Sequence, residues 1–418
     1  MTKADKEGQR KAPILRFKGF TDAWEQRKIK DYANYRRGSF PQPYGKKEWY
    51  GGNDSMPFVQ VVDVKENLHL ADHTKQRISK LAQPKSVFVP AGEVLVTVQG
   101  SIGRVAITQY PSYIDRTLIV FEKYNTRTDK YFWAYTLQRK FEMEKRKAPG
   151  GTIKTITKKA LSDFSIPITN YEEQGYLGTF FLKVDKLLTL YDRKLKLLSQ
   201  VKKYFLDNLF AEKEYPNLRF KGFTDAWEQR KLSSLFIKFT DGDWIESKDQ
   251  SNSGIRLIQT GNIGVSKFIN KVGNEKWISE KTLKELNCTE IFPGDIIISR
   301  LPEPTGRACI LPEFSTRMIT AVDCTIARVS KSVSAEFIVQ YLSTQTYFKY
   351  IQSRLAGGTR QRISRKNLAD FNTFIPALEE QKEIGLVFNY LDSLIALYEN
   401  KQQHLTEIKN TLLNTMFI

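Results

Sequence analysis

The segment LRFKGFTDAWEQRK occupies residues 15–28, and the same segment returns at residues 218–231. Later landmarks also return. PAGEVLVTVQGSIGRVAI from Pro90 parallels FPGDIIISRLPEPTGRACI from Phe292, and GGTIKTITKKALSDF from Gly150 parallels GGTRQRISRKNLADF from Gly357. The separation between equivalent residues changes only from 203 to 207 along the chain. The chain is therefore two copies of one structural unit, with short insertions between them.

The two copies differ in an informative pattern. The stretch that follows each AWEQRK is mostly dissimilar between the copies, whereas the flanking segments are nearly the same. Random drift would spread the differences evenly. The pattern therefore predicts a fixed frame that holds two variable modules.

The composition favours a polyanionic partner. The chain has 418 residues, with 65 Lys and Arg against 46 Asp and Glu, which gives a net charge of +19. An excess of this size is typical of proteins that bind nucleic acid. The alternative is a basic protein that its charge keeps in solution. Hydrophobic residues make up 41% of the chain, enough for folded cores.

Cysteine and histidine usage argues against a zinc site. The three cysteines include no CxxC pair, and the chain has only three histidines, so no zinc-binding spacing exists. Buried thiols of a reducing compartment are the expected role of the cysteines. The charged N-terminal stretch has no apolar core and no stretch is long enough to span a membrane, which predicts a cytoplasmic protein.

Each copy predicts a similar order of elements. Asp22 with Glu25, like Asp225 with Glu228, has the spacing of a capping box, which predicts a short helix in the repeated segment. We expect its aromatic residues to pack on the adjoining domain. β-branched runs near residues 86–107 and 289–310 predict strands broken by turns, and residues 130–147 and 335–355 have helical periodicity.

The segments after Glu172 and Glu379 carry a sustained seven-residue apolar repeat, which predicts two long helices. At about 38 residues, each helix would span roughly 57 Å. One such helix cannot bury its apolar seam alone, but two in one chain can pair; an ordinary core helix is the alternative. Lys202 and Lys409 interrupt the seam, where polar residues specify register or mark where another protein enters.

Catalytic signatures are absent from the sequence. It contains no GxxxxGK[ST] loop, no [DN]PP[YF] loop, no HExxH, and no GxGxxG that opens a helix. A nuclease or a self-contained methyltransferase is therefore a less favoured interpretation than a binding protein.

Turns rich in Arg, Gln and Asn recur at matched places in the two modules. Arg can bond guanine and Asn or Gln can bond adenine in the major groove, whereas Lys and Arg also hold phosphates. The Gly-Gly-Thr loop keeps its frame in both copies while its middle residues change, which suits sequence readout. An Arg that pairs with a neighbouring carboxylate is the alternative at each position. The candidate DNA-binding residues are Arg36, Arg37, Gln60, Gln99, Arg104, Lys154, Trp244, Gln259, Asn262, Arg300, Arg307, Arg360 and Arg362.

Together, the repeated opening segment, the GDIIISR…GR turn, the GGT…L-x-D-F module end and the EEQ helix start resemble the specificity subunit of bacterial type I restriction–modification systems. The resemblance covers the chain from Pro13 to Ile418. It implies an α+β fold, with two mixed α/β target recognition domains joined by two long antiparallel coiled-coil helices in a pseudo-two-fold internal repeat. The first module departs from the pattern with GEVLVTVQG, so Arg300 has no Arg counterpart there.

The resemblance also implies a domain division. We expect a disordered tail at residues 1–12, a first target recognition domain at 13–168 and a central spacer helix at 169–213. A second target recognition domain at 214–376 and a C-terminal spacer helix at 377–418 would complete the chain.

Partners follow from the resemblance as well. Each target recognition domain would read one half of a split site on double-stranded DNA. Two methyltransferase subunits would dock on the helices and two motor–nuclease subunits would join that complex. S-adenosylmethionine, ATP and Mg²⁺ would belong to those partners, with no cofactor in this chain. A stand-alone DNA-binding protein without methyltransferase partners is the main rival. The candidate partner-binding residues are Leu177, Phe181, Leu188, Lys202, Ile384, Phe388, Ile395 and Lys409.

Overall fold

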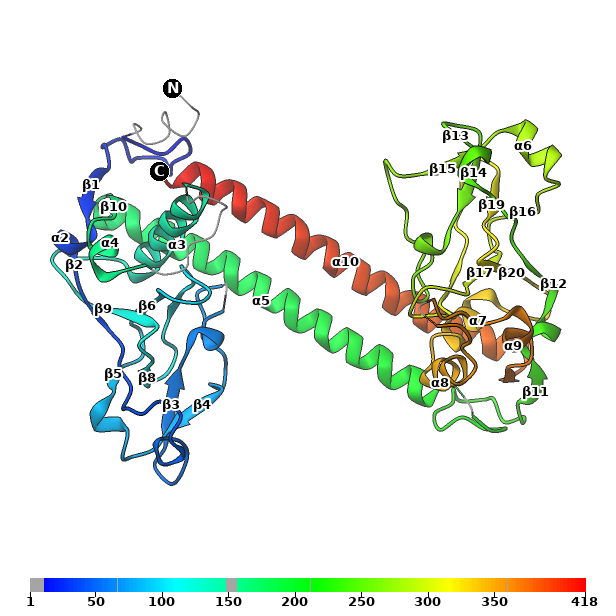
Figure 1. Ribbon diagram of the computed structural model, residues 1–418, viewed down its shortest axis with the longest axis horizontal. Coiled ribbons are helices and arrows are strands. Elements are labelled where there is room, and N and C mark those ends of the chain that lie inside the picture. Colours follow the sequence, from blue (N-terminus) through cyan, green and yellow to red (C-terminus); the bar gives the residue numbers. More distant parts are fainter. Residues whose placement is uncertain (1–10, 66, 148–155, 211, 359) are drawn as a thin grey trace. The chain divides into compact units, whose positions relative to one another are not determined.

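The computed structural model describes residues 11–65, 67–147, 156–210, 212–358 and 360–418 (Figure 1). Its internal contacts divide the chain into two units. The first unit combines Met1–Asp192 with Asn400–Ile418, and the second unit is Arg193–Glu399. Each variable module thus lies within one unit, whereas each of the two long helices contributes a part to both. The predicted tail falls mainly outside the described residues, as does Lys154.

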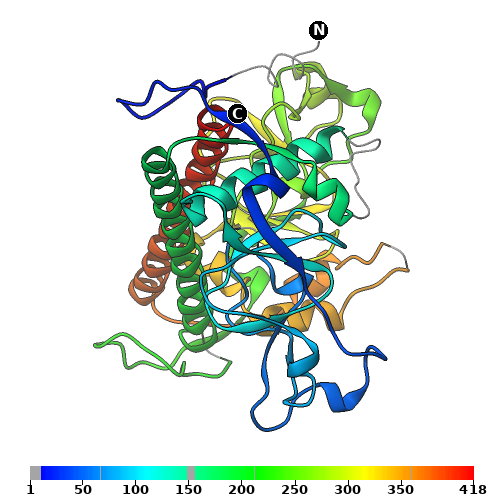
Figure 2. The ribbon, with the colours of Figure 1, turned by 90° about the vertical axis from the view of Figure 1, so that its left-hand side faces the viewer.

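Two four-stranded sheets form the module of the first unit, in the orders β2-β9-β6-β7 and β4-β3-β8-β5. All neighbouring strands are antiparallel except β3 and β8, which are parallel. In Figure 2, β1 (Glu25–Lys28), α2 (Ile29–Tyr32) and β2 follow one another as a blue path across this unit. The strands are β2 (Ala33–Arg37), β3 (Met56–Val59), β4 (Gln76–Ile78), β5 (Val87–Val89), β6 (Val94–Thr97), β7 (Val105–Ile107), β8 (Ser112–Ile114) and β9 (Leu118–Tyr124).

The second module repeats this topology although its sequence differs. Its sheets have the orders β12-β20-β17-β18 and β13-β15-β14-β19-β16, and β14 and β19 form the parallel pair. Only β13 has no counterpart among the described strands of the first module. The strands are β12 (Phe236–Asp241), β13 (Gln250–Ser251), β14 (Ile255–Ile258), β15 (Lys276–Ile278), β16 (Glu290–Ile291), β17 (Ile296–Ser299), β18 (Ala308–Ile310), β19 (Met318–Thr320) and β20 (Cys324–Val329).

The central strands explain the continuous apolar runs of the sequence. Every residue of β6 and of β17 is buried. In β17, Ile296 and Ile298 face one hydrophobic cluster and Ile297 faces another. Because successive side chains of a strand point to opposite faces, such a strand must be apolar on both faces. The predicted strands in these two regions are confirmed.

The helix predicted in the repeated segment is wrong. Glu25–Lys28 forms strand β1, which pairs antiparallel with β10 (Ser165–Ile168), and Glu228–Lys231 forms β11, which pairs with β21 (Asn372–Ile375). The partner strand comes from the far end of each module. It forms hydrogen bonds with the backbone of the repeated segment. This tertiary pairing overrides the local helix signal of the capping box.

The helices that close each module follow the predicted periodicity. Lys130–Lys147 forms α3, as predicted, whereas the second segment divides into α7 (Ala335–Tyr341) and α8 (Gln345–Ser353). The division occurs because the Thr344 side chain accepts a hydrogen bond from Tyr347 N and so caps a new helix. The remaining short helices are α2 (Ile29–Tyr32), α4 (Lys158–Ser162), α6 (Glu280–Glu285) and α9 (Arg365–Ala369).

The two long helices are α5 (Tyr171–Asn208) and α10 (Leu378–Met416). Seam residues of the predicted seven-residue repeat are all buried or half-buried, which confirms the periodicity. In the first unit the seam brings Asp185 to Lys409, and in the second it brings Lys202 to Asp392. In the first unit Asp192 also meets Gln402. Residue numbers rise along one helix as they fall along the other, so the helices are antiparallel within each unit.

Each module's core is completed by the helix of the other copy. Phe417, just beyond the end of α10, packs against Phe132 of the first unit with ring centroids 5.7 Å apart. Phe210, just beyond the end of α5, packs against Phe337 of the second unit at 5.2 Å. Phe210 and Phe417 are equivalent positions of the repeat. The duplication therefore lets each copy finish the core of its neighbour.

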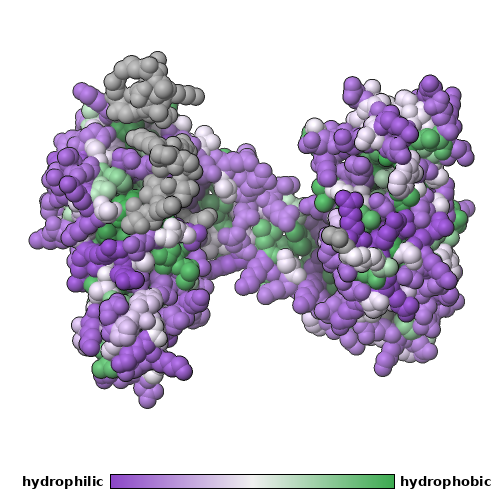
Figure 3. Space-filling model, in the orientation of Figure 1, coloured by the Kyte–Doolittle hydropathy of each residue, from purple (hydrophilic) through white to green (hydrophobic). Residues whose placement is uncertain are grey.

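The surface and the buried thiols agree with the composition. Hydrophilic residues predominate on the face of each unit that Figure 3 shows. Cys309 and Cys324 are buried and Cys288 is half-buried, and all three are free thiols.

No helix among the described residues is both long and apolar enough to cross a membrane. The part of the chain that the structure describes also holds no cluster of His, Cys, Asp and Glu suited to a metal ion.

Candidate nucleic-acid interface

In both modules, the turns that follow the central strands meet at one edge, which we call the reading edge. In the first module it comprises residues 60–64, 98–104 and 115–117, and in the second residues 259–263, 300–307 and 321–323. Backbone hydrogen bonds join these turns. Val98 N donates to Thr117 O at 2.9 Å, and Arg300 N donates to Asp323 O at the same distance. Most of the predicted DNA-binding residues that the structure describes therefore come together on these two edges or beside them.

The first reading edge displays a polar cluster around Tyr44. Gln60 Nε2 donates to Tyr44 Oη at 2.7 Å, and the Tyr44 hydroxyl donates to Asp115 Oδ2 at 3.3 Å. The guanidinium of Arg116 lies 5.7 Å from the Tyr44 ring centroid. Burial, together with the Asp115 charge, raises the pKa of Tyr44 to about 12, so its phenol keeps its proton near neutral pH. The cluster presents amide, hydroxyl and guanidinium groups to the solvent.

Trp244 lies beside the second reading edge, in the loop that follows β12. Its side chain is 69% exposed, and its indole N–H donates to Glu246 Oε1 at 3.2 Å. The loop begins at Gly242, where a Cβ would lie 2.3 Å from Thr320 O, so only glycine fits. Gly38 begins the equivalent loop of the first module with the same close approach to Asp115 O. The two loops are thus anchored alike but display different aromatic side chains.

The Gly-Arg turns serve the interior more than the surface. Arg307 is 8% exposed, and its guanidinium donates to backbone carbonyls. Burial lowers its pKa. Its acceptors are the carbonyl oxygens of Thr260, Ile263, Pro302 and Pro304. The prediction that Arg307 contacts DNA is therefore revised, because its donors hold two turns of the reading edge together.

Arg104 occupies the equivalent turn of the first module and is less buried than Arg307. Its side chain is half-buried, and Nη1 donates to Val64 O at 3.3 Å. It lines a cavity of about 870 Å³ within the first unit, between the module and the two helices. Gly103 and Gly306 precede the two arginines with φ of +78° and +90°, a conformation that favours glycine. The matched Gly-Arg pairs are therefore a shared turn geometry.

Asn262 also has an internal role. Its side chain is 7% exposed; Oδ1 accepts from Gln259 N and Nδ2 donates to Ile269 O, both at 3.0 Å. Asp63 makes the same turn in the first module by accepting from Gln60 N at 2.8 Å. We therefore revise the prediction for Asn262 to a turn-forming role. Gln259 is half-buried beside it.

The remaining predicted residues differ in exposure. Arg36 and Arg37 are exposed on β2; Arg36 pairs with Glu122 at 2.6 Å, and Arg37 donates to the Arg116 carbonyl. Gln99 is half-buried in the hairpin between β6 and β7. Arg300 is 5% exposed and donates to Val322 O at 2.5 Å, so it supports the second edge from beneath. The exposed residues among those predicted in the second module are Trp244, Arg360 and Arg362, which lie beside its edge.

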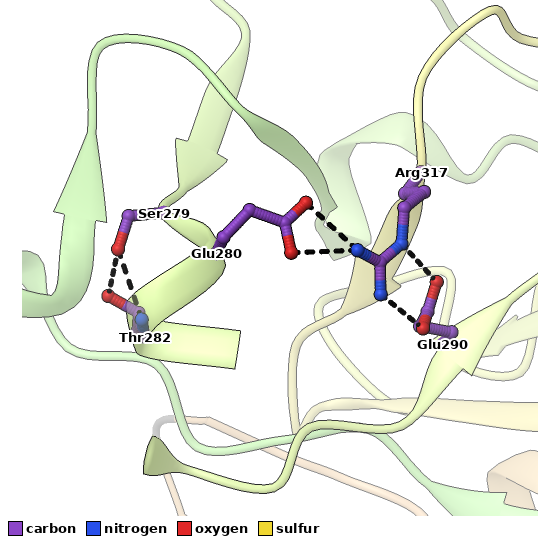
Figure 4. A network of polar contacts seen from close by, with 5 residues as sticks. All are labelled: Ser279, Glu280, Thr282, Glu290 and Arg317. Atoms are coloured by element: carbon purple, nitrogen blue, oxygen red, sulfur yellow. Dashed lines mark hydrogen bonds and ion pairs between the residues drawn. The ribbon is translucent and has the colours of Figure 1, made fainter. Parts of the chain in front are cut away.

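Exposure alone does not make an arginine available to DNA, as Arg317 shows (Figure 4). It precedes β19 and so lies at the opposite end of this strand from the reading edge. Its guanidinium contacts Glu290 at 2.6 Å and Glu280 at 2.7 Å. Hydrogen bonds to these two carboxylates raise its pKa, and the same contact lowers the pKa of Glu290. Two carboxylates already compensate its charge.

The predicted partner-binding residues of the helices lie inside the units. Phe181 and Phe388 are fully buried, Leu188 and Ile395 are half-buried, and the two lysines form ion pairs. Leu177 and Ile384 are buried as well. We therefore revise the prediction that these residues contact a partner subunit directly, because the seam of each long helix faces the other long helix. The exposed large apolar residues of α5 and α10 are Tyr171, Tyr176, Leu187, Leu190, Leu197, Tyr204, Leu386, Tyr390, Leu397 and Ile408.

Comparison with known proteins agrees with this architecture. The family model for the type I restriction modification DNA specificity domain matches residues 21–200 and again residues 224–407. The chain belongs to this family. Each match spans one module and most of the helix that follows it. The duplication thus corresponds to two specificity domains in one chain.

Relatives and solved structures share the arrangement across nearly the whole chain. The MjaVIII specificity subunit of Methanocaldococcus jannaschii is 22% identical over 408 residues, covering 94% of this chain and 92% of that protein. The EcoBI specificity subunit of Escherichia coli is 19% identical, with 95% and 86% covered. The crystal structure of the S subunit from M. genitalium superposes with a TM-score of 0.60 at 16% identity, covering 97% and 99% of the two chains.

The fixed frame of this tandem specificity-domain protein rests on a buried ion pair that sequence reasoning missed. Arg16 Nε lies 2.6 Å from Glu173 Oε1, and the Trp24 indole donates to the same carboxylate at 3.1 Å. Arg219 Nε bonds Glu380 in the second copy at 2.7 Å. The repeated opening segment and the EEQ helix start are thus the two sides of one contact. The recurrence of both motifs was its signal in the sequence.

The adjoining glutamines fix each helix to its module. Gln174 Oε1 accepts from Asp129 N at 3.0 Å, and Gln381 Oε1 accepts from Ser334 N at 2.9 Å. These bonds place the start of α5 against α3 and the start of α10 against α7. The EEQ motif is therefore a structural device in both copies.

Some polar residues of the reading edges carried no sequence signal. These residues lie at strand ends that are distant in sequence from the turns at Gln60 and Gln259. They are Asp115, Arg116, Asp241 and Asp323. A motif search cannot group them, because only the sheet order brings β8 beside β3 and β20 beside β12 and β17.

Proposed function

We propose that the chain is the DNA specificity subunit of a type I restriction–modification complex, in which each module reads one half of a bipartite, asymmetric site. One observation carries this proposal. The two modules have the same topology and the same anchored loops, yet they display different side chains at the reading edge. Tyr44, Gln60 and Arg116 lie on or beside the first edge, whereas Trp244, Arg360 and Arg362 lie beside the second. Two unlike edges suit two unlike half-sites.

The charge of the chain suits duplex DNA. The net charge of +19 favours the phosphate backbone, and contacts from Lys and Arg would set the orientation of each module. Base edges in the major groove would then be read by amide and guanidinium groups. In this proposal the chain recognises DNA, whereas methyl transfer and cleavage belong to its partners. S-adenosylmethionine, ATP and Mg²⁺ would be bound by those partners.

The helices offer a surface for methyltransferase subunits. Exposed apolar residues such as Leu190, Leu386 and Tyr390 lie outside the seam. Exposed apolar patches on a protein surface often mark sites of protein–protein contact. A solved structure of similar fold concerns complex assembly and conformational transition of the type I R–M system. It superposes on this chain with a TM-score of 0.53 at 15% identity. We infer that two methyltransferase subunits dock on the helices of this chain, and that two motor–nuclease subunits join through that complex.

Exchange of one module tests the proposal. Residues 30–160 would be replaced by the corresponding module of another family member, and methylated sites would be mapped in a host that supplies the methyltransferase. We expect one half-site to change and the other to remain, because the reading edges are built from separate modules. Alteration of both half-sites would contradict independent reading. Unchanged sites would show that the first module does not read DNA.

A further inference from the structure

Asp323 and Arg362 form a partly exposed ion pair at the second reading edge. Arg362 Nη2 lies 3.3 Å from Asp323 Oδ1, and the side chains are 45% and 34% exposed. Among the described residues, no other group bonds to the Arg362 guanidinium. The Arg362 side chain is thus partly exposed to solvent while one side of its guanidinium is held by a carboxylate.

The backbone of both residues is fixed. Arg362 N donates to Ala356 O at 2.9 Å, and Ala356 N donates to Arg362 O at 3.1 Å, which closes the base of the Gly-Gly-Thr loop. The next residue, Ile363, donates through its N–H to Arg300 O at 3.2 Å. Asp323 O accepts from Arg300 N at 2.9 Å. The pair thus stands on a rigid base next to the central strand β17.

Arg300 supports the pair from beneath. Its guanidinium lies 3.3 Å from Asp241 Oδ2 and donates to Val322 O, and the residue is buried. Burial lowers the pKa of Arg300, and the neighbouring Asp241 carboxylate opposes that effect. The carboxylates of Asp241 and Asp323 would repel the phosphates of bound DNA unless nearby cations compensated their charge. Here Arg300 and Arg362 provide that compensation, so Asp323 orients Arg362 without leaving a net negative site.

The described residues of the first module hold no such pair at this place. Thr117 occupies the backbone position of Asp323, since Val98 N donates to its carbonyl, and its hydroxyl donates to Asp115 Oδ1 at 2.7 Å. The sequence equivalent of Arg362 is Thr155, which lies outside the described residues. The frame of the two edges is shared, so this difference concerns what the edges display.

We propose that Arg362, held by Asp323, reads a guanine in the half-site of the second module. An oriented guanidinium can donate two parallel hydrogen bonds to guanine O6 and N7 in the major groove, and no other base offers two acceptors there. Arg362 is the base-contacting residue and Asp323 is its positioning residue. This inference rests on the proposed function, and it adds a base identity that the function alone does not imply.

The test couples a protein substitution to a base substitution. Methylated-site mapping first gives the second half-site, and the full chain is then titrated with duplexes in which single guanines carry 7-deazaguanine, which lacks the N7 acceptor. For the unaltered chain we expect one guanine whose replacement weakens binding by about 5- to 150-fold. Arg362→Ala should weaken binding to the natural site by a similar factor and should no longer respond to that replacement. Asp323→Asn should retain a reduced response, because the guanidinium remains but loses its orientation.

Arg354→Ala is the matched control. Arg354 is an exposed arginine of the same module whose guanidinium lies 5.3 Å from the Tyr350 ring centroid. Its removal changes the charge equally but should leave the 7-deazaguanine response intact. A second half-site without guanine would overturn the inference, as would an Arg362→Ala chain that responds like the unaltered one. Failure of the unaltered chain to bind or direct methylation would instead count against the proposed function.

Discussion

The ammonium of Lys409 on α10 lies 2.6 Å from the carboxylate of Asp185 on α5, and both side chains are buried. In the second unit, Lys202 on α5 meets Asp392 on α10 at 2.5 Å. Both members are shifted by 207 positions, so the second pair is the first with the helices exchanged. The polar interruptions of the two seams are therefore complementary. They set one antiparallel register in each unit, as buried polar seam residues do in coiled coils.

Removal of Lys409 should strongly destabilise the first unit. In Lys409→Ala, Asp185 would remain buried at 2% exposure without its cation, and such a loss costs about 3–5 kcal/mol. Lys202→Ala is the matched control. Its pair has exposures of 17% and 33%, so solvent screens the orphaned carboxylate and the cost should be about 1 kcal/mol. Chemical denaturation of both variants measures the difference; equal costs would show that burial does not govern these pairs.

Arg307 and Arg362 should separate by phenotype. Arg307→Ala leaves buried carbonyls without donors, at about 1–3 kcal/mol for each unsatisfied group, so it should lower the melting temperature of the second unit. Arg362→Ala should leave the melting temperature near that of the unaltered chain and weaken DNA binding. Thermal unfolding and binding titrations at one salt concentration check both. A stable Arg307→Ala chain with weak DNA binding would restore the surface role first predicted for Arg307.

Asp129 gives a pH-dependent prediction. Burial raises its pKa above the ordinary 3.8, although hydrogen bonds from the backbone at the start of α3 oppose the shift. The folded state therefore prefers the protonated carboxyl. Asp129 contributes stability at low pH, and that contribution is lost as pH rises through the raised pKa.

Asp129→Asn keeps the oxygen that accepts from Phe132 N and removes the charge. The variant should be more stable than the unaltered chain at pH 7, and the difference should shrink as pH falls toward 4. Thermal unfolding at both pH values measures it. Ser334 caps α7 at the equivalent place without a charge, so Ser334→Asn is the control, for which we expect no such pH dependence. An advantage of Asp129→Asn that grows on acidification would contradict the assigned direction.

The antiparallel register determines how the helices can be lengthened. Because Asp192 meets Gln402 and Lys202 meets Asp392, a seven-residue insertion after Leu198 is matched by one after Ile395. An insertion after Leu405, the repeat equivalent of Leu198, would not match the insertion in α5. The helical turns between Ile395 and Leu405 would then be shifted by one heptad relative to α5. The matched pair adds roughly 10 Å to each helix.

If the helices act as the spacer, mapped sites should keep both half-sites, and the unread gap should lengthen by about three base pairs at 3.4 Å each. Insertion in α5 alone is the control, since it would break the register and should abolish modification. Modified sites with the original gap would show that these helices do not set the spacing.

Much of the fold followed from local patterns in the sequence. The central strands were predictable because β6 and β17 are apolar on both faces, and α3 because its periodicity covers a single continuous helix. The seam of the long helices was predictable because a seven-residue repeat defines which side is buried. The internal duplication and the family resemblance came from the same kind of information. Each depends on spacing along the chain, which the sequence displays directly.

Only the tertiary structure decided which residues meet from distant segments. It paired Glu25–Lys28 with β10, set the register through Lys409 and Asp185, and carried Phe417 into the core of the first unit. It also turned Arg307 inward while leaving Arg362 at the surface. Sequence showed both as arginines beside glycine-containing turns, because the direction of a side chain depends on acceptors that other strands bring within reach. Those acceptors are fixed by sheet order, which no local pattern encodes.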